Sequence, residues 1–182
     1  MAEETPPSVG KDIPDANAVE KPKAQQLDEL FATLKSAGSG EAGRTAEGEI
    51  LRLWLSSGSD TVDVLMTWAL RAMGAKDYST ALDILDRIVT MKPEYVEGWN
   101  KRATVYFLTN DYAKSIADIG RTLALEPRHF GALAGLGMIM HGLGDDKRAI
   151  EAFKAALDVD PYLDNVKKSL DDIEASDAGS PI

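Results

Sequence analysis

The chain has 182 residues, of which 44% are hydrophobic, with 30 acidic against 20 basic side chains and a net charge of −10. An acidic surface argues against binding the phosphates of nucleic acid and against docking on anionic lipid. The sequence contains no cysteine, which excludes disulfides, thiol catalysis and cysteine-based metal sites. Its longest apolar run is about half of the ~20 residues needed to cross a membrane.

The first segment, residues 1–24, holds four prolines and few large apolar groups, and we predict that it is disordered. No signal peptide is visible. Residues 2–7 nevertheless resemble the start of a mature exported chain behind an added Met1, so we expect a periplasmic protein whose signal peptide has been removed. A flexible cytoplasmic N-terminus is the alternative.

Residues 25–58 carry two short apolar stripes at helical spacing. The first is Leu27, Leu30, Phe31 and Leu34; the second is Ile50, Leu51, Trp54 and Leu55. A glycine-rich stretch separates them, so the segment predicts a helical hairpin. We interpret it as a degenerate repeat in register with those that follow, acting as an N-terminal cap.

Three prolines, Pro93, Pro127 and Pro161, stand 34 residues apart, and an aspartate and a small residue recur at the same spacing. The copies run over 62–95, 96–129 and 130–163. Each proline ends a helix, each aspartate caps the next one, and each small residue lets two helices approach. Gly137 is such a residue, and we expect it to tolerate alanine but not leucine.

The second copy carries Trp99, Ala103, Tyr106, Tyr112 and Pro127 at the positions typical of one family. The chain therefore resembles the tetratricopeptide repeat family. The resemblance implies an all-α, right-handed solenoid of three helical hairpins over residues 25–175. Arg102 and Thr122 depart from the family pattern, which leaves local packing there open.

After the third copy, residues 162–175 form an apolar stripe opposite charged residues, which predicts a C-terminal capping helix. Residues 176–182 are predicted to be a disordered tail.

In this family the first helix of each hairpin lines a concave groove. The resemblance places in it Met66, Leu70, Met73, Glu97, Asn100, Lys101, Thr104, Phe107, Leu108, Met138 and His141. The strip is mostly apolar, which favours binding an apolar segment of another protein. It is equally consistent with cover by the cap helices or by a neighbouring copy.

One branch of the family grips a partner's C-terminal carboxylate with basic and amide side chains. The matching residues here are Met66, Leu70, Lys101, Gly131 and Gly135, so that clamp is absent.

No pattern of catalytic, cofactor-binding or metal-binding residues is found. The two histidines, His129 and His141, are twelve residues apart without a partner at ligand spacing, and we expect His129 to be solvated in a turn. The glycines over 131–144 lack the lysine of a phosphate-binding loop.

We therefore expect a non-catalytic adaptor with an unidentified protein partner and no cofactor. A finer resemblance to small proteobacterial envelope repeat proteins implies that it works in the bacterial cell envelope. The alternatives are a self-associating structural module, with a homodimer as its simplest form, and a regulatory or appended subunit of an enzyme complex.

Overall fold

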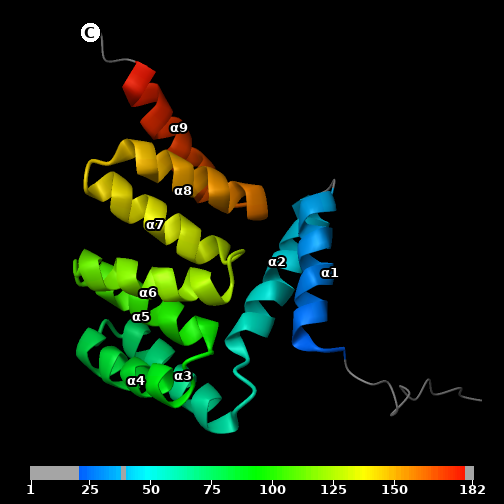
Figure 1. The fold of residues 1–182 in the computed structure, drawn as a ribbon, viewed down its shortest axis with the longest axis vertical. Coiled ribbons are helices and arrows are strands. Elements are labelled where there is room, and N and C mark those ends of the chain that lie inside the picture. Colours follow the sequence, from blue (N-terminus) through cyan, green and yellow to red (C-terminus); the bar gives the residue numbers. More distant parts are fainter. Residues whose placement is uncertain (1–20, 38–39, 179–182) are drawn as a thin grey trace, which may run out of the picture.

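The computed structural model describes residues 21–37 and 40–178, and these ranges contain nine α-helices and no strand (Figure 1). The helices are α1 (Lys23–Ser36), α2 (Gly40–Leu55), α3 (Asp60–Gly74), α4 (Tyr78–Met91), α5 (Val96–Leu108), α6 (Tyr112–Leu125), α7 (Phe130–Gly142), α8 (Asp146–Val159) and α9 (Asp164–Ala178). None of the helices in these ranges is long and apolar enough to cross a membrane. The all-α repeat fold predicted from the sequence is confirmed.

The three repeats are the helix pairs α3–α4, α5–α6 and α7–α8, and their internal turns share one design. An aspartate side chain caps each second helix by accepting a backbone N–H three residues on: Asp77 from Thr80, Asp111 from Lys114, Asp145 from Arg148. The residue before each aspartate has left-handed backbone, with φ of 59° at Lys76, 60° at Asn110 and 77° at Gly144. The recurring aspartates therefore mark real helix starts.

Close helix packing inside the repeats depends on the small residues. Ala81 and Ala149 are fully buried. Ser115 stands at the equivalent position of the second repeat, and its hydroxyl donates to the Ala103 carbonyl at 2.8 Å. On the first helix of the third repeat, a Cβ added to Gly137 would lie 2.5 Å from the ring of Phe153.

The two departures from the family pattern are compensated locally. Arg102 donates to both carboxylate oxygens of Asp118 at 2.7 and 2.8 Å and to Asp86 at 2.8 Å, which ties α4, α5 and α6 together. Its guanidinium also lies 4.9 Å from the centre of the Trp99 ring. The buried Thr122 hydroxyl donates to the Asp118 carbonyl within its own helix.

Helix α9 covers the last repeat, as predicted. Val166, Leu170 and Ile173 are buried in one cluster with Phe153 and Ala156 of α8. The helix continues to Ala178, so three residues of the predicted tail are helical, while 179–182 lie outside the described residues.

The N-terminal helical hairpin is present, but its predicted place as a cap in register with the repeats is wrong. Helices α1 and α2 pack on each other, but they lie beside the stack instead of on its end, with α2 touching α5 and α1 touching α8 (Figure 1). The reason is that their apolar side chains find a matching row on the turns between repeats. Helix α1 also begins at Lys23, inside the segment predicted to be disordered; residues 1–20 of that segment lie outside the described residues.

Candidate binding groove and hairpin seam

The hairpin meets the stack along a seam formed by the last position of each repeat, namely Tyr95, His129 and Leu163. The Tyr95 hydroxyl donates to the Leu55 carbonyl at 2.7 Å, and burial raises the pKa of this phenol, which keeps it a donor. Leu163 packs against the apolar cluster of the hairpin. One straight hairpin therefore contacts three successive turns.

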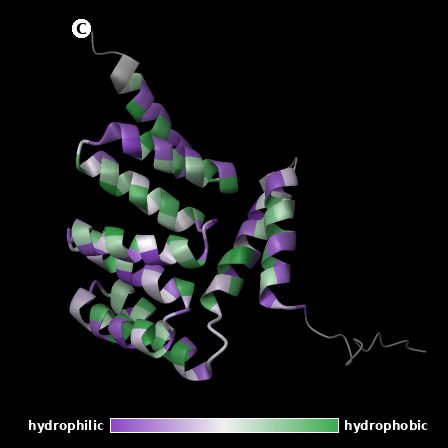
Figure 2. Ribbon diagram, in the orientation of Figure 1, coloured by the Kyte–Doolittle hydropathy of each residue, from purple (hydrophilic) through white to green (hydrophobic). Residues whose placement is uncertain are grey.

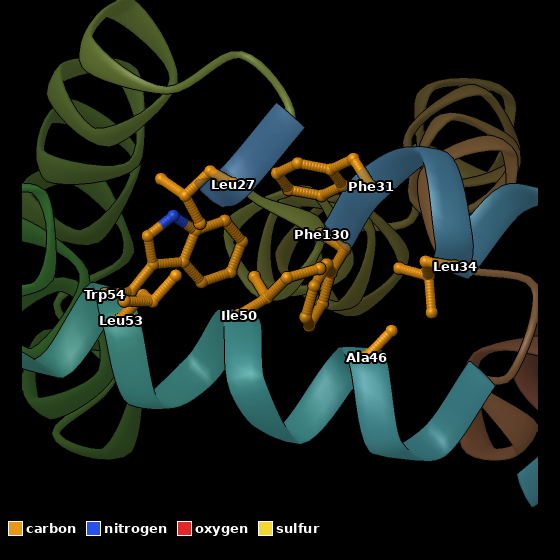
Figure 3. Packing of buried hydrophobic residues seen from close by; sticks show 8 residues of the cluster. All are labelled: Leu27, Phe31, Leu34, Ala46, Ile50, Leu53, Trp54 and Phe130. Atoms are coloured by element: carbon orange, nitrogen blue, oxygen red, sulfur yellow. The ribbon is translucent and has the colours of Figure 1, made fainter. Parts of the chain in front are cut away.

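The centre of the seam is an aromatic stack around Trp54. Its indole lies 4.1 Å from the His129 ring, with the planes 10° apart, and 5.1 Å from the Phe130 ring. Figure 3 shows Trp54, Phe31 and Phe130 filling the space between α1 and α2. Arg128 covers the outer side, 4.2 Å from the centre of the Phe31 ring. Such packing holds the hairpin by apolar burial and ring stacking.

Beneath this stack lies a buried carboxylate. Glu97 is 1% exposed, and its side chain accepts from His129 Nε2, Lys101 Nζ and Asn100 Nδ2, each at 3.1 Å. Burial by itself would raise the pKa of Glu97, but the His129 hydrogen bond, the Lys101 charge and the Asn100 amide outweigh it and lower the pKa to about 2. The carboxylate is therefore ionised at neutral pH.

The hydrogen bonds of His129 define its protonation state. Its Nδ1 accepts the backbone N–H of Ala132 at 3.0 Å and caps α7, so the ring proton sits on Nε2 and is donated to Glu97. The expectation that His129 is solvated is wrong, because this side chain is fully enclosed between Trp54 and Glu97. It is a structural histidine that joins the hairpin to two repeats.

The concave side of the stack carries a small hollow of about 80 Å³ between α5, α6 and α7. The residues that line it are Asn100, Ala103, Thr104, Phe107, Ser115, Ile119, Gly131, Ala132, Gly135, Met138 and Ile139. Four of these, Asn100, Thr104, Phe107 and Met138, belong to the predicted groove. Met138 is 42% exposed, so its thioether is open to a ligand.

No charged side chain lines this hollow. Its polar groups are already engaged within the chain: Thr104 donates to the Asn100 carbonyl, Ser115 to the Ala103 carbonyl, and the Asn100 amide to Glu97. Acceptor capacity remains on the hydroxyl and amide oxygens, together with the second N–H of the Asn100 amide. Elsewhere in the described ranges no three His, Cys, Asp or Glu side chains gather to hold a metal ion.

The other predicted groove residues do not form one continuous row. Met66 and Glu97, at 2% and 1% exposure, are interior and cannot touch a partner, which corrects their assignment. Met66 packs among the side chains of α3, α4 and α5, and Ala134 at the same position of the third repeat is buried too. The remainder, Leu70, Met73, Lys101, Leu108 and His141, are exposed or half-buried outside the hollow.

A profile of the tetratricopeptide repeat matches residues 66–121 and 109–164, together more than half of the chain. A TPR repeat-containing protein of Rhizobium etli is 41% identical over 149 residues, covering 82% of this chain and 72% of that protein. The chain belongs to the tetratricopeptide repeat family.

Solved structures of this family share the fold at low identity. The first repeat domain of Spaghetti (RPAP3), bound to an Hsp90 peptide, superposes with a TM-score of 0.62 at 19% identity, covering 65% of this chain and 94% of that one. The secretion translocator chaperone SycD of Yersinia enterocolitica gives 0.63 at 12% identity, covering 65% and 96%. These likenesses concern the fold alone.

Sequence reasoning identified the repeats of this tetratricopeptide protein but missed the seam. A signal was present: Tyr95 and His129 are large rings at the same turn position of two repeats, where small and polar residues are usual. Phe130, the first residue of α7, adds a third ring beside them. Rings at equivalent turn positions indicate that something covers the turns.

Proposed function

We propose that this protein is a non-catalytic adaptor that holds an apolar side chain of a partner protein in the hollow between α5, α6 and α7. One observation carries the proposal: two glycines, Gly131 and Gly135, leave open a concave site whose lining has no charge. A Cβ at Gly135 would make only ordinary contact, 3.7 Å from Ile119, so helix packing does not require glycine there. The space is therefore free for a ligand.

The ligand class follows from the lining. Phe107 and Met138 flank the hollow, and an aromatic ring with a flexible thioether adapts to aliphatic side chains of differing shape. The Hsp90 peptide in the related RPAP3 structure, SRMEEVD, ends in acidic residues. No lysine or arginine lines the hollow here, so we propose an internal apolar segment as the ligand in place of an acidic C-terminal tail.

The affinity comes mainly from removing apolar surface from water. The acceptor oxygens of Asn100 and Thr104 would bind backbone N–H groups of the segment and fix its direction. Glu97 supports this from below, because its bond to the Asn100 amide nitrogen holds that side chain in place.

The test fills the hollow. Gly135→Leu should occupy the space without disturbing the stack, whereas Gly120→Leu adds the same side chain to an exposed helix position with nothing within 4 Å. Peptides selected from a random displayed library on the unaltered protein should carry an apolar anchor. They should bind Gly135→Leu about thirtyfold or more weakly, the loss expected of a hot-spot contact.

Binding of the same peptides to Gly120→Leu should be unchanged. The proposal is overturned if the selected peptides require a free acidic C-terminus, or if Gly135→Leu binds them as the unaltered protein does.

We also propose that the adaptor works in the bacterial cell envelope. The support is the resemblance to small proteobacterial envelope repeat proteins. Fractionation of the native cells with antibody detection tests it, and recovery in the cytoplasmic fraction would reject it.

A further inference from the structure

The sideways position of the hairpin leaves the first helix of the first repeat without a neighbour on its outer face. In α5 and α7 the same face packs against the second helix of the preceding repeat, and Val105 and Ile139 there are 0% and 1% exposed. In α3 the face instead holds Val64 and Trp68, at 48% and 52% exposure. A surface built for helix packing is therefore open to solvent.

The exposed residues of this face form one narrow stripe. They are Thr61, Val64, Trp68, Arg71 and Ala75, spaced by three and four residues in alternation. Contact residues in a pair of packed helices have this spacing. A hollow of about 320 Å³, lined by Asp60, Thr61, Val64, Leu65 and Trp68, lies along it.

The opposite end of the stack does not offer a complementary surface. The outer side of α9 presents Lys167, Lys168, Asp171, Asp172 and Glu174, all exposed. Much of the α9 ribbon is coloured hydrophilic in Figure 2. Head-to-tail stacking would bury these charges against Val64 and Trp68, at a high desolvation cost. The apolar end therefore fits a copy of itself better than the other end of a neighbour.

Charge along α3 sets the direction of such a pairing. Asp60 lies in the first turn and Arg71 in the last, and neither has an ion-pair partner among the described residues. Antiparallel pairing places the acidic turn of each helix beside the basic turn of the other, whereas parallel pairing would bring like charges together.

We propose that a second copy of this chain covers the α3 face, with the two α3 helices antiparallel across a two-fold axis. In this arrangement Trp68 of each copy enters the hollow of the other and packs on its Val64, and Arg71 lies beside Thr61 and Asp60 across the interface. Such an isologous contact closes at two copies. The groove on α5–α7 is a separate surface, so the dimer presents two adaptor sites.

The interface involves one helix from each copy, which is small beside the roughly 1,600 Å² of a standard interface. We therefore expect a reversible dimer, measured by analytical ultracentrifugation of the full chain over a wide concentration range. Trp68→Glu should weaken dimerisation about thirtyfold or more. Leu143→Glu, at a site that is 57% exposed in the third repeat, is the matched control and should leave it unchanged.

Charge reversal tests the direction of pairing. Asp60→Arg alone and Arg71→Asp alone should each weaken the dimer, and the double variant should restore it, while circular dichroism reports whether each variant remains helical. A full chain that is monomeric at every concentration overturns the proposal. It is overturned also if dimers form only after residues 1–20 have been removed. A dimer that Trp68→Glu leaves intact, or a double variant no better than the single ones, overturns it as well.

Discussion

The repeats are flanked by two helical additions that solve different problems. Helix α9 lies on the end of the stack and continues its packing, burying Val166, Leu170 and Ile173 against the last repeat. The α1–α2 hairpin runs alongside and touches the turn after each of the three repeats, through the cluster around Trp54 and the hydrogen bond from Tyr95 to Leu55. An amphipathic segment next to a solenoid therefore does not have to pack on the end of the stack. Helix α9 does so, whereas the hairpin packs along the side and connects the turns of successive repeats.

The hairpin beside the stack adds contacts between distant parts of the chain to a fold otherwise stabilised by contacts between adjacent repeats. Among repeats alone, each helix pair contacts only the pairs beside it, so repeat stability is nearly a sum of local terms. The hairpin instead joins the Tyr95 turn to the Tyr162 turn, because those hydroxyls donate to Leu55 and Ala37 respectively. These contacts with the stack are nevertheless few, so we expect the hairpin to open separately from unfolding of the repeats.

The largest expected effect comes from Trp54→Ala. Removing a fully buried ring from the seam should cost about 3–5 kcal/mol, enough to undock α1 and α2 while α3–α9 remain folded. Hydrogen exchange should show lost protection in α1 and α2 only. Leu170→Ala in α9 should cost about 2–5 kcal/mol and reduce protection in α8 and α9.

Trp54→Phe provides the matched control. The indole Nε1 is buried without a hydrogen-bond partner among the described residues, so phenylalanine loses no bond and keeps the stacking on His129. We expect less than about 1.5 kcal/mol of destabilisation. Loss of protection throughout α3–α9 in Trp54→Ala would show that hairpin and stack unfold together.

The sequence predicts the two additions unequally, for a physical reason. An amphipathic stripe shows that a helix buries one face, but it does not show against what. For α9 the nearest open apolar surface is the repeat just before it, so chain order suffices. For the hairpin the partners Tyr95, His129 and Leu163 are spread over 68 residues of sequence and meet only after the repeats have stacked. The groove was predicted in part for a similar reason. The repeat pattern places residues on a helix face, but packing against α4 and α5 decides that Met66 is buried.

Acid should weaken the seam at its centre, where Glu97 binds His129 beneath the Trp54 stack. The folded pKa of Glu97, about 2, lies below the usual value of 4.5, so its stabilising contribution is complete above about pH 4.5 and is lost as the pH falls toward 2. The loss is on the order of 3 kcal/mol at most. Urea unfolding at a series of pH values measures it, and Glu97→Gln should flatten the profile over this window.

Two other carboxylates, Glu47 in α2 and Asp160 after α8, should respond in the opposite direction. Burial raises the pKa of Asp160 and of Glu47, and the negative charge of Asp160 raises that of Glu47 further. A raised folded pKa gives stability that is greatest in acid and declines as the pH rises through it. Glu47→Gln should remove part of this decline.

The acid prediction for Glu97 has its own control. If the stability of Glu97→Gln follows that of the unaltered protein at every pH, the Glu97 carboxylate is not the source of the stability lost in acid.

The smallest expected effect compares two glycines that each face an aromatic ring, Gly137 within the third repeat and Gly43 on the hairpin opposite Tyr162. Sequence reasoning expects Gly137→Ala to be tolerated, but the added Cβ would sit 2.5 Å from the ring of Phe153, which is 1% exposed and has nowhere to move. Gly137→Ala should therefore destabilise the repeats by about 1–3 kcal/mol despite its better helix propensity.

Gly43→Ala should behave differently because Tyr162 is only half-buried and its ring can swing outward, giving up its hydrogen bond to the Ala37 carbonyl. We expect the global free energy of unfolding to change little, while hydrogen exchange in α1 and α2 becomes faster. The two alanine variants thus separate packing inside a repeat from docking along the seam. Equal effects of both on global stability would mean that the hairpin belongs to the same cooperative unit as the repeats, and a neutral Gly137→Ala would mean that Phe153 is less confined than its burial indicates.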